Sequence, residues 1–190
     1  RQMCIRDRHS SDRTIAIAER YGCKIVYCER YPYVEPARNF AIAQAQYPWV
    51  LVIDADETIP AKLREYLYQI TENPTIGGVY IPFKNYFIDQ YMRSAYPDFK
   101  LRFFKKEGAD WPKEIHSTVK IQGKVIKIPR HRTDLASEHL ANDSVTTILS
   151  KNNNYSTQEV ERRKGKRIGW GKLLFSPFFW FVKYYFIKKG

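Results

Sequence analysis

The chain has few cysteines, no long uninterrupted apolar run and no internal repeat or low-complexity segment. Its three cysteines, Cys4, Cys23 and Cys28, are an odd number without metal-ligand spacing. They therefore indicate no zinc site and favour a reducing compartment. The apolar stretch near the C-terminus is short and interrupted by lysines, so it is not typical of a spanning helix, and no secretory signal peptide is visible.

Basic residues are abundant and concentrated at one end. The formal net charge is +12, and residues 151–190 hold ten Lys and Arg against two Glu, a net +8. Such a segment attracts anionic lipid, nucleic acid or an acidic substrate, and charge alone does not choose among them. A length of 190 residues with 44% hydrophobic residues predicts one main domain plus this tail.

The order of apolar and polar segments predicts an α/β fold. Helical spacing alternates with short apolar runs through the first half, which favours a parallel sheet, whereas the second half is more antiparallel. We interpret residues 1–8 as a non-native leader, 9–140 as the main domain with an incomplete N-terminus, and 141–190 as a helical tail. The expected strands are 23–29, 49–54, 77–88 and 99–106, and the expected helices include 10–22, 37–46 and 61–71.

Three acids stand within four positions at the end of the apolar run 49–54. Asp54, Asp56 and Glu57 repel one another unless a cation or a proton lies between them. The carboxyl end of a strand in an open α/β sheet is also where ligands bind. Asp54 and Asp56 therefore predict a shared divalent ion, Mn²⁺ or Mg²⁺, that neutralises phosphate oxygens. The alternative is a loop-start cluster that caps the following helix.

Two enzyme families resemble this motif. The run VLVIDADETI, with Thr58, is similar to haloacid-dehalogenase-like phosphatases, in which the first Asp, here Asp54, attacks phosphorus. That resemblance is local, because the downstream acidic pair of the family is missing here. A second resemblance spans nearly the whole chain, through SSDRTIAIAERYGCKIV, ARNFAIAQAQYPWVLVIDADE, GGVYIPFKNYF, KLRFFKK and EIHSTV. These segments resemble inverting glycosyltransferases of family 2.

The family 2 resemblance implies a fold and a site. The fold is glycosyltransferase-A-like, a Rossmann-like mixed sheet flanked by helices, with the family's first strand missing here and a basic, aromatic helical tail. The resemblance places Asp56, Asp54 and His139 at the metal. It places Asp7, Asp12, Arg38, Asn39, Asp54, Trp111 and His116 at the nucleotide sugar, with Asp7 in the position that reads uracil.

An inverting transfer also needs a base for the acceptor hydroxyl. Trp111, Glu114 and His116 form a compact set in the second half: an aromatic for sugar stacking, a carboxylate for the base and an imidazole for phosphate or metal. The family branch has Glu directly after the His, where this chain has Ser117. We take Glu114 as the base, with Asp98 and Asp110 as the next candidates.

The resemblance is greatest to the bacterial branch of lipopolysaccharide core glucosyltransferases. It implies transfer of a hexose, glucose by preference, from UDP-glucose to a lipopolysaccharide-core or other lipid-linked glycan acceptor.

The run FSPFFWFVKYYFIKK interleaves aromatics with lysines, which is typical of an interfacial helix on an anionic membrane. We therefore expect a cytoplasmic protein, peripheral on the inner face of the bacterial cytoplasmic membrane, and no nucleic-acid partner. The alternatives are a tail helix packed on its own domain, the phosphatase, and an inactive membrane-docking fragment.

Overall fold

The computed structural model describes residues 3–7, 9–29, 35–114, 117–142, 144–165 and 169–188. Its strands are β1 (Cys4–Asp7), β2 (Lys24–Tyr27), β3 (Trp49–Leu51), β4 (Glu57–Thr58), β5 (Ile76–Phe87), β6 (Gln90–Tyr91), β7 (Asp98–Lys105), β8 (Lys124–Lys127) and β9 (Ser137–Asn142). Its α-helices are α1 (Thr14–Arg20), α2 (Arg38–Ala43), α3 (Ala61–Thr71), α4 (Val145–Arg163) and α5 (Trp170–Phe181). A π-helix over Val182–Ile187 continues α5.

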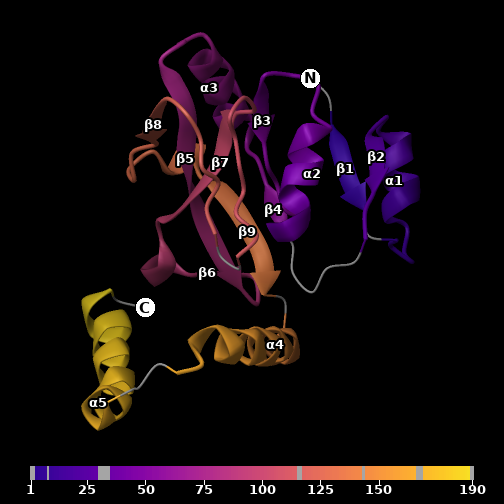
Figure 1. The fold of residues 1–190 in the computed structure, drawn as a ribbon. Coiled ribbons are helices and arrows are strands. Elements are labelled where there is room, and N and C mark those ends of the chain that lie inside the picture. Colours follow the sequence, from indigo (N-terminus) through magenta and orange to yellow (C-terminus); the bar gives the residue numbers. More distant parts are fainter. Residues whose placement is uncertain are drawn as a thin grey trace. The chain divides into compact units, whose positions relative to one another are not determined.

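Most strands belong to one mixed sheet (Figure 1). Its order is β3-β7-β5-β9-β4, and β6 and β8 also pair with β5. The pairing of β5 is parallel with β8 and β9 and antiparallel with β6. Strands β1 and β2 form a separate parallel pair. The predicted α/β class with a mixed sheet is confirmed.

Local sequence explains the best-defined elements. Pro60 directly precedes α3, where its missing N–H costs nothing, and Leu63 and Leu67 follow one another on the buried face of that helix. In β5, Val79, Ile81 and Phe83 alternate along the strand and are almost completely buried. Both elements match their sequence predictions, because each is long and its apolar period is regular.

A short strand lies near the N-terminus. Within residues 1–8, which we interpret as a non-native leader, Cys4–Asp7 forms β1 and pairs in parallel register with β2. Asp7 ends this strand and is buried. A backbone ladder to β2 satisfies the polar groups of this short segment, and the eight-residue window contains too few apolar side chains to show a period.

The strand before the acidic cluster corrects one prediction. We expected 49–54 to form a central strand of a parallel sheet, covered on both faces. Among the described residues β3 stands at one end of the sheet order, pairs antiparallel with β7, and is only partly buried. Apolar, β-branched composition predicts a strand but does not choose its neighbour.

The chain forms two compact units, which we describe separately. The first comprises 1–53, 61–81 and 99–135, and the second comprises 54–60, 82–98 and 136–190. The second contains α4 and α5, so the predicted tail is helical. No helix in the described part of the chain is long and apolar enough to span a bilayer.

Candidate functional site

The acidic segment after β3 is a tight turn closed by Glu57. The Glu57 N–H donates to the Asp54 carbonyl oxygen at 3.0 Å, and the Asp54 N–H donates back to Glu57 Oε2 at 3.0 Å. Glu57 is only 8% exposed. Its carboxylate is therefore used in closing the turn, which leaves Asp54 and Asp56 as the two partly exposed acids of the motif.

Strand β9 brings a histidine to this turn. His139 is the register partner of Glu57 in the antiparallel β4–β9 pair, and the Leu140 N–H donates to the Asp56 carbonyl oxygen at 2.8 Å. The His139 Nε2 atom lies 3.7 Å from Asp56 Oδ2, and the two side chains are 23% and 39% exposed. A carboxylate and an imidazole therefore face each other within reach of solvent.

The donor set of this pair fits a divalent cation. Carboxylate oxygen and imidazole nitrogen bind such ions at about 2.0–2.2 Å, so two ligands of one ion lie between about 3 and 4.4 Å apart. The 3.7 Å separation falls in that range. Within the described residues no group of three or more His, Cys, Asp or Glu side chains is placed to hold a metal ion.

Two further polar residues extend this pair along β5 and β7. Asn85 is the register partner of His139 in the parallel β5–β9 pair, and its Oδ1 lies 2.7 Å from His139 Nδ1. Its Nδ2 donates to Asp98 Oδ2 at 3.3 Å. Asn85 thus contacts both His139 and Asp98, which is a candidate base from the sequence. Sequence reasoning missed Asn85, although it continues the buried row of Val79, Ile81 and Phe83 in steps of two.

A second set of predicted residues lies in the first unit around the 110–111 backbone. The Asn39 amide donates to Asp110 Oδ1 at 2.9 Å and to the Trp111 carbonyl oxygen at 3.0 Å, and its Oδ1 accepts from the Trp111 N–H at 2.7 Å. The Arg38 guanidinium lies 4.5 Å from the centre of the Trp111 ring and is buried. In this structure Arg38 and Asn39 hold a loop and its tryptophan in place.

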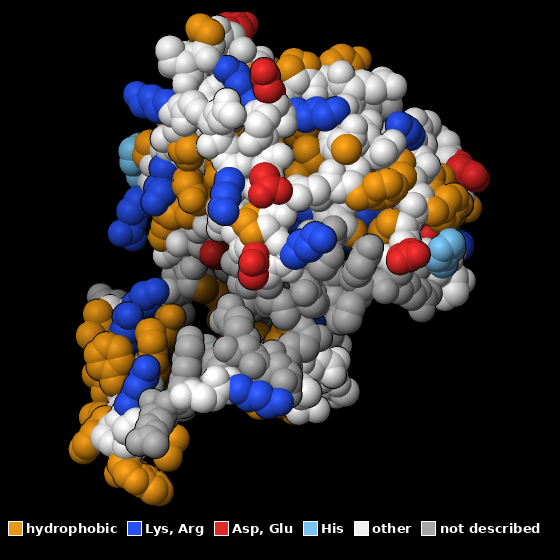
Figure 2. All heavy atoms as spheres, viewed as in Figure 1, with side chains coloured by type: hydrophobic (Ala, Val, Ile, Leu, Met, Phe, Trp, Pro, Cys, Tyr) orange, Lys and Arg blue, Asp and Glu red, His pale blue; other side chains and the backbone are white. Residues whose placement is uncertain are grey.

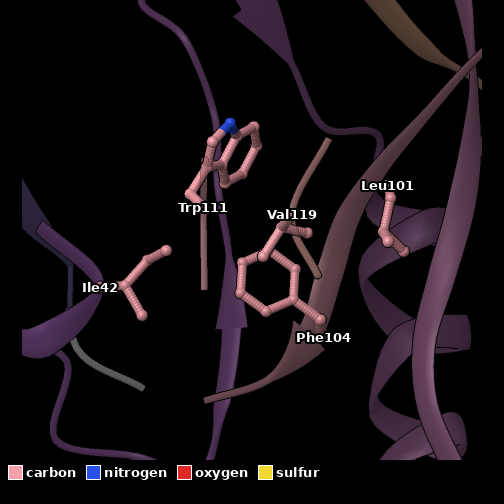
Figure 3. Close-up of a cluster of buried hydrophobic side chains, with 5 residues drawn as sticks. All are labelled: Ile42, Leu101, Phe104, Trp111 and Val119. Atoms are coloured by element: carbon pink, nitrogen blue, oxygen red, sulfur yellow. The ribbon is translucent and has the colours of Figure 1, made fainter. Parts of the chain in front are cut away.

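Trp111 does not fit the predicted role of a sugar platform. It is 5% exposed and packs in a core cluster with Ile42, Leu101, Phe104 and Val119 (Figure 3). Phe104 meets it edge to face at 6.3 Å between ring centres. The physical reason is the burial of a large apolar ring among side chains from α2 and β7, a pattern the isolated segment WPKEIH does not reveal.

Of the remaining predicted residues that the structure describes, Asp7 ends β1, and Asp12 and Glu114 lie on bends. Glu114 is exposed on a bend where its carbonyl oxygen accepts from the Ser117 N–H at 3.1 Å. His116 lies outside the described residues. Asp7 accepts from the Ser10 N–H at 2.9 Å and from the Ser10 hydroxyl. Asp12 accepts from the Thr14 N–H at 2.9 Å, and hydrogen bonding by Thr14 lowers the pKa of Asp12. Both acids thus shape the turn into α1.

Comparison with known proteins identifies the family. The model of "Glycosyl transferase family 2" matches residues 1–122. The chain belongs to glycosyltransferase family 2. This stretch includes Asp54, Asp56 and Glu114, whereas the phosphatase resemblance rested on the local Asp-x-Asp motif alone. The prediction of a transferase enzyme is confirmed at the level of the family.

Longer relatives support the assignment. Uncharacterized glycosyltransferases of Rickettsia conorii and Rickettsia felis are 26% and 25% identical to this chain. The alignments cover 99% of this chain and 71% and 70% of the relatives. A third, from Rickettsia typhi, is 26% identical over 99% of this chain and 68% of the relative. The likeness to transferases therefore extends beyond the matched family segment into the tail.

Proposed function

We propose that this family 2 enzyme transfers a hexosyl group, by preference glucose from UDP-glucose, to a lipopolysaccharide-core or other lipid-linked glycan hydroxyl with inversion. The observation that carries the proposal is the Asp56–His139 pair, with Nε2 and Oδ2 3.7 Å apart at a strand-supported turn. Asp56 and His139 would hold Mn²⁺ or Mg²⁺, which would neutralise charge on the departing diphosphate. Asp54, on the same turn, would contact the ribose or a water bound to the cation.

The transfer forms one bond and breaks another at the anomeric carbon. The acceptor oxygen attacks that carbon, the bond to the β-phosphate oxygen breaks, and the hydroxyl proton passes to a carboxylate. We propose Glu114 as this base, since its side chain is exposed whereas Asp110 accepts from Asn39 and Asp98 accepts from Asn85. Arg38 and Asn39 act on the 110–111 loop, which precedes Glu114, and Asp7 and Asp12 on the turn before α1.

The first test replaces the carboxylate that faces His139. Asp56→Asn keeps the shape of the side chain and removes the charge that a divalent cation needs. We expect calorimetric binding of Mn²⁺, and of UDP-glucose in its presence, to fall at least tenfold while circular dichroism stays unchanged. Asp89→Asn is the matched control, because Asp89 is exposed at φ 58°, a conformation that Asn tolerates.

Two outcomes contradict this proposal. An Asp56→Asn protein that binds Mn²⁺ and donor as tightly as the parent removes the cation site from the mechanism. A phospho-aspartyl adduct on Asp54, trapped with beryllium fluoride and found by mass spectrometry, favours the phosphatase alternative, because direct sugar transfer forms no such adduct.

We also propose that the C-terminal helices contact an anionic membrane, on the inner face of a bacterial cytoplasmic membrane. Apolar side chains of α5 and the π-helix are exposed, including Phe178 at 67%, Phe186 at 62% and Ile187 at 72%. Figure 2 shows hydrophobic side chains beside basic ones on the surface of this helical segment. Lys183 Nζ lies 4.5 Å from the Trp180 ring centre, and Lys188 Nζ lies 4.9 Å from that of Tyr184. Rings beside ammonium groups suit the boundary between acyl chains and anionic headgroups.

A further inference from the structure

We infer that Asn85 and Asp98 are positioning residues that fix the tautomer of His139, so that its Nε2 lone pair faces Asp56. This inference rests on the proposed function, in which His139 and Asp56 hold the cation. Asn85, His139 and Asp56 lie on or beside paired strands, and the contacts among their side chains form a row that ends at Asp98. In that row, the direction of each hydrogen bond determines the direction of the following one.

The direction is set at Asp98. A carboxylate accepts hydrogen bonds and donates none, so the end of the Asn85 amide that faces Asp98 is the NH₂ group. The contact joins Asn85 Nδ2 and Asp98 Oδ2 at 3.3 Å. The carbonyl oxygen of the same amide then faces His139. Reversing the amide would bring two acceptors together at Asp98, and Asp98 therefore fixes the orientation of Asn85.

The oriented amide sets the proton on the imidazole. Asn85 Oδ1 lies 2.7 Å from His139 Nδ1, and a carbonyl oxygen only accepts, so Nδ1 carries the proton. In the neutral ring the lone pair is then on Nε2, the atom 3.7 Å from Asp56 Oδ2. Imidazole binds a metal through its unprotonated nitrogen, and the hydrogen bond at the other nitrogen orients the ring.

The backbone keeps this row in register. Asn85 and His139 are paired residues of β5 and β9, and Glu57 and His139 are paired residues of β4 and β9. The hydrogen bond from the Leu140 N–H to the Asp56 carbonyl oxygen, at 2.8 Å, ties the acidic turn to the same strand. The row therefore connects a cation ligand to two neighbouring strands, and its members need no induced movement to meet.

The direct test reads the tautomer in the metal-free protein. Long-range ¹H–¹⁵N correlation spectra at alkaline pH distinguish a protonated from an unprotonated ring nitrogen, and the His139→Gln variant assigns the signals among the four histidines. We expect His139 to carry its proton on Nδ1. Asn85→Leu removes the acceptor at similar volume, and we expect the Nε2–H tautomer to become populated in that variant.

The second measurement is the affinity for Mn²⁺ alone. Loss of a partner that orients a metal ligand typically weakens binding about 10–100-fold, and we expect this for Asn85→Leu. The Asn85→Asp, Asp98→Asn double variant exchanges acid and amide, so an acceptor oxygen at position 85 still faces His139. The hydrogen bond between positions 85 and 98 is reversed, because the amide at position 98 now donates to the carboxylate at position 85. We expect this exchange to restore both tautomer and affinity. Asn152→Leu, on the exposed side of α4, is the matched control.

The outcomes separate this inference from the proposed function. A parent protein with the proton on Nε2 overturns the inference even if it binds Mn²⁺, and this result is read in the parent protein itself. An Asn85→Leu protein that keeps both the Nδ1–H tautomer and the parent's affinity also overturns it. A parent that shows the Nδ1–H tautomer but binds no Mn²⁺ supports the row of hydrogen bonds and overturns the cation site instead.

Discussion

At the scale of single residues, Glu57 explains how three acids stand within four positions. Its carboxylate accepts from the Asp54 N–H inside the turn, and the side chain is almost fully buried. The hydrogen bond from the backbone N–H replaces water that the buried carboxylate has lost. Only Asp54 and Asp56 then remain for a cation, and the crowding that predicts a metal site involves two carboxylates rather than three.

The burial of Trp111, another single residue, leads to a prediction about the stability of the protein. The ring is buried in the core cluster, and its Nε1–H has no hydrogen-bond partner among the described residues. Trp111→Phe keeps much of the buried ring and loses no hydrogen bond, whereas Trp111→Ala leaves a cavity. We expect Trp111→Ala to lower the free energy of unfolding by about 3–5 kcal/mol and Trp111→Phe by clearly less.

Urea denaturation followed by circular dichroism measures both losses. Trp170→Ala is the control for removing an indole. Because Trp170 is exposed on α5, this substitution should lower the free energy of unfolding only slightly. Equal losses for Trp111→Phe and Trp111→Ala would show that the indole N–H, rather than the packed ring, stabilises this position.

At the scale of elements, two glycines set the distance between β5 and the segment before β8. A Cβ on Gly77 would lie 1.9 Å from the carbonyl oxygen of Gln122, and one on Gly123 would lie 3.2 Å from the Gly77 Cα. The neighbours are backbone atoms, which cannot rotate away. We expect Gly77→Ala to destabilise the protein by about 1–3 kcal/mol or more through overpacking.

Thermal unfolding of Gly77→Ala checks this expectation. Gly171→Ala is the matched control, since Gly171 lies in α5 with nothing within 4 Å of a built Cβ. Alanine favours a helix over glycine, so this control should not lower the melting temperature. A Gly77→Ala protein as stable as the parent would mean that the β5–β8 pairing is looser than the structure has it.

The elements also show what a sequence reveals and what it does not. The helix α3 follows from Pro60 and a regular apolar period, and β5 follows from a long aromatic run, because both signals are local. The antiparallel partner of β3 does not follow, since the identity of a neighbouring strand depends on residues far along the chain.

The same distinction between local sequence signals and long-range contacts applies to the candidate site. Asp54 and Asp56 are visible in one apolar run that ends in acids, and their chemistry suggests a cation. The contact between Asn85 and His139 joins positions 54 apart, and no local pattern pairs them. Burial of Trp111 depends on Ile42 and Val119 in the same way. The kind of ligand that the acids favour could thus be predicted from local sequence. The residues that contact one another in the site could be identified only from the folded structure.

At the scale of the whole molecule, positive charge and exposed apolar side chains occur in the same segment of the chain. Residues 151–190 carry a net +8 of the chain's +12, and the same segment contains the exposed aromatics of α5 and the π-helix. Lys166, Arg167 and Lys189 of this segment lie outside the described residues. Long-range attraction and ring burial respond differently to salt, because only the first is screened. Salt therefore separates the two contributions to membrane binding.

The last prediction concerns vesicles that contain anionic phospholipid. Each basic residue near such a surface contributes about 1 kcal/mol, whereas inserted rings hold the protein after the charges are screened. Co-sedimentation of a Phe179→Ala, Trp180→Ala variant should fall steeply with added salt, and that of the parent only partly. A Tyr21→Ala, Tyr68→Ala variant, which removes exposed rings from α1's end and α3, should behave as the parent does. A parent that stays in solution at low salt, with Trp180 fluorescence unchanged by vesicles, would show that these rings are covered by protein, because buried indoles do not sense added lipid.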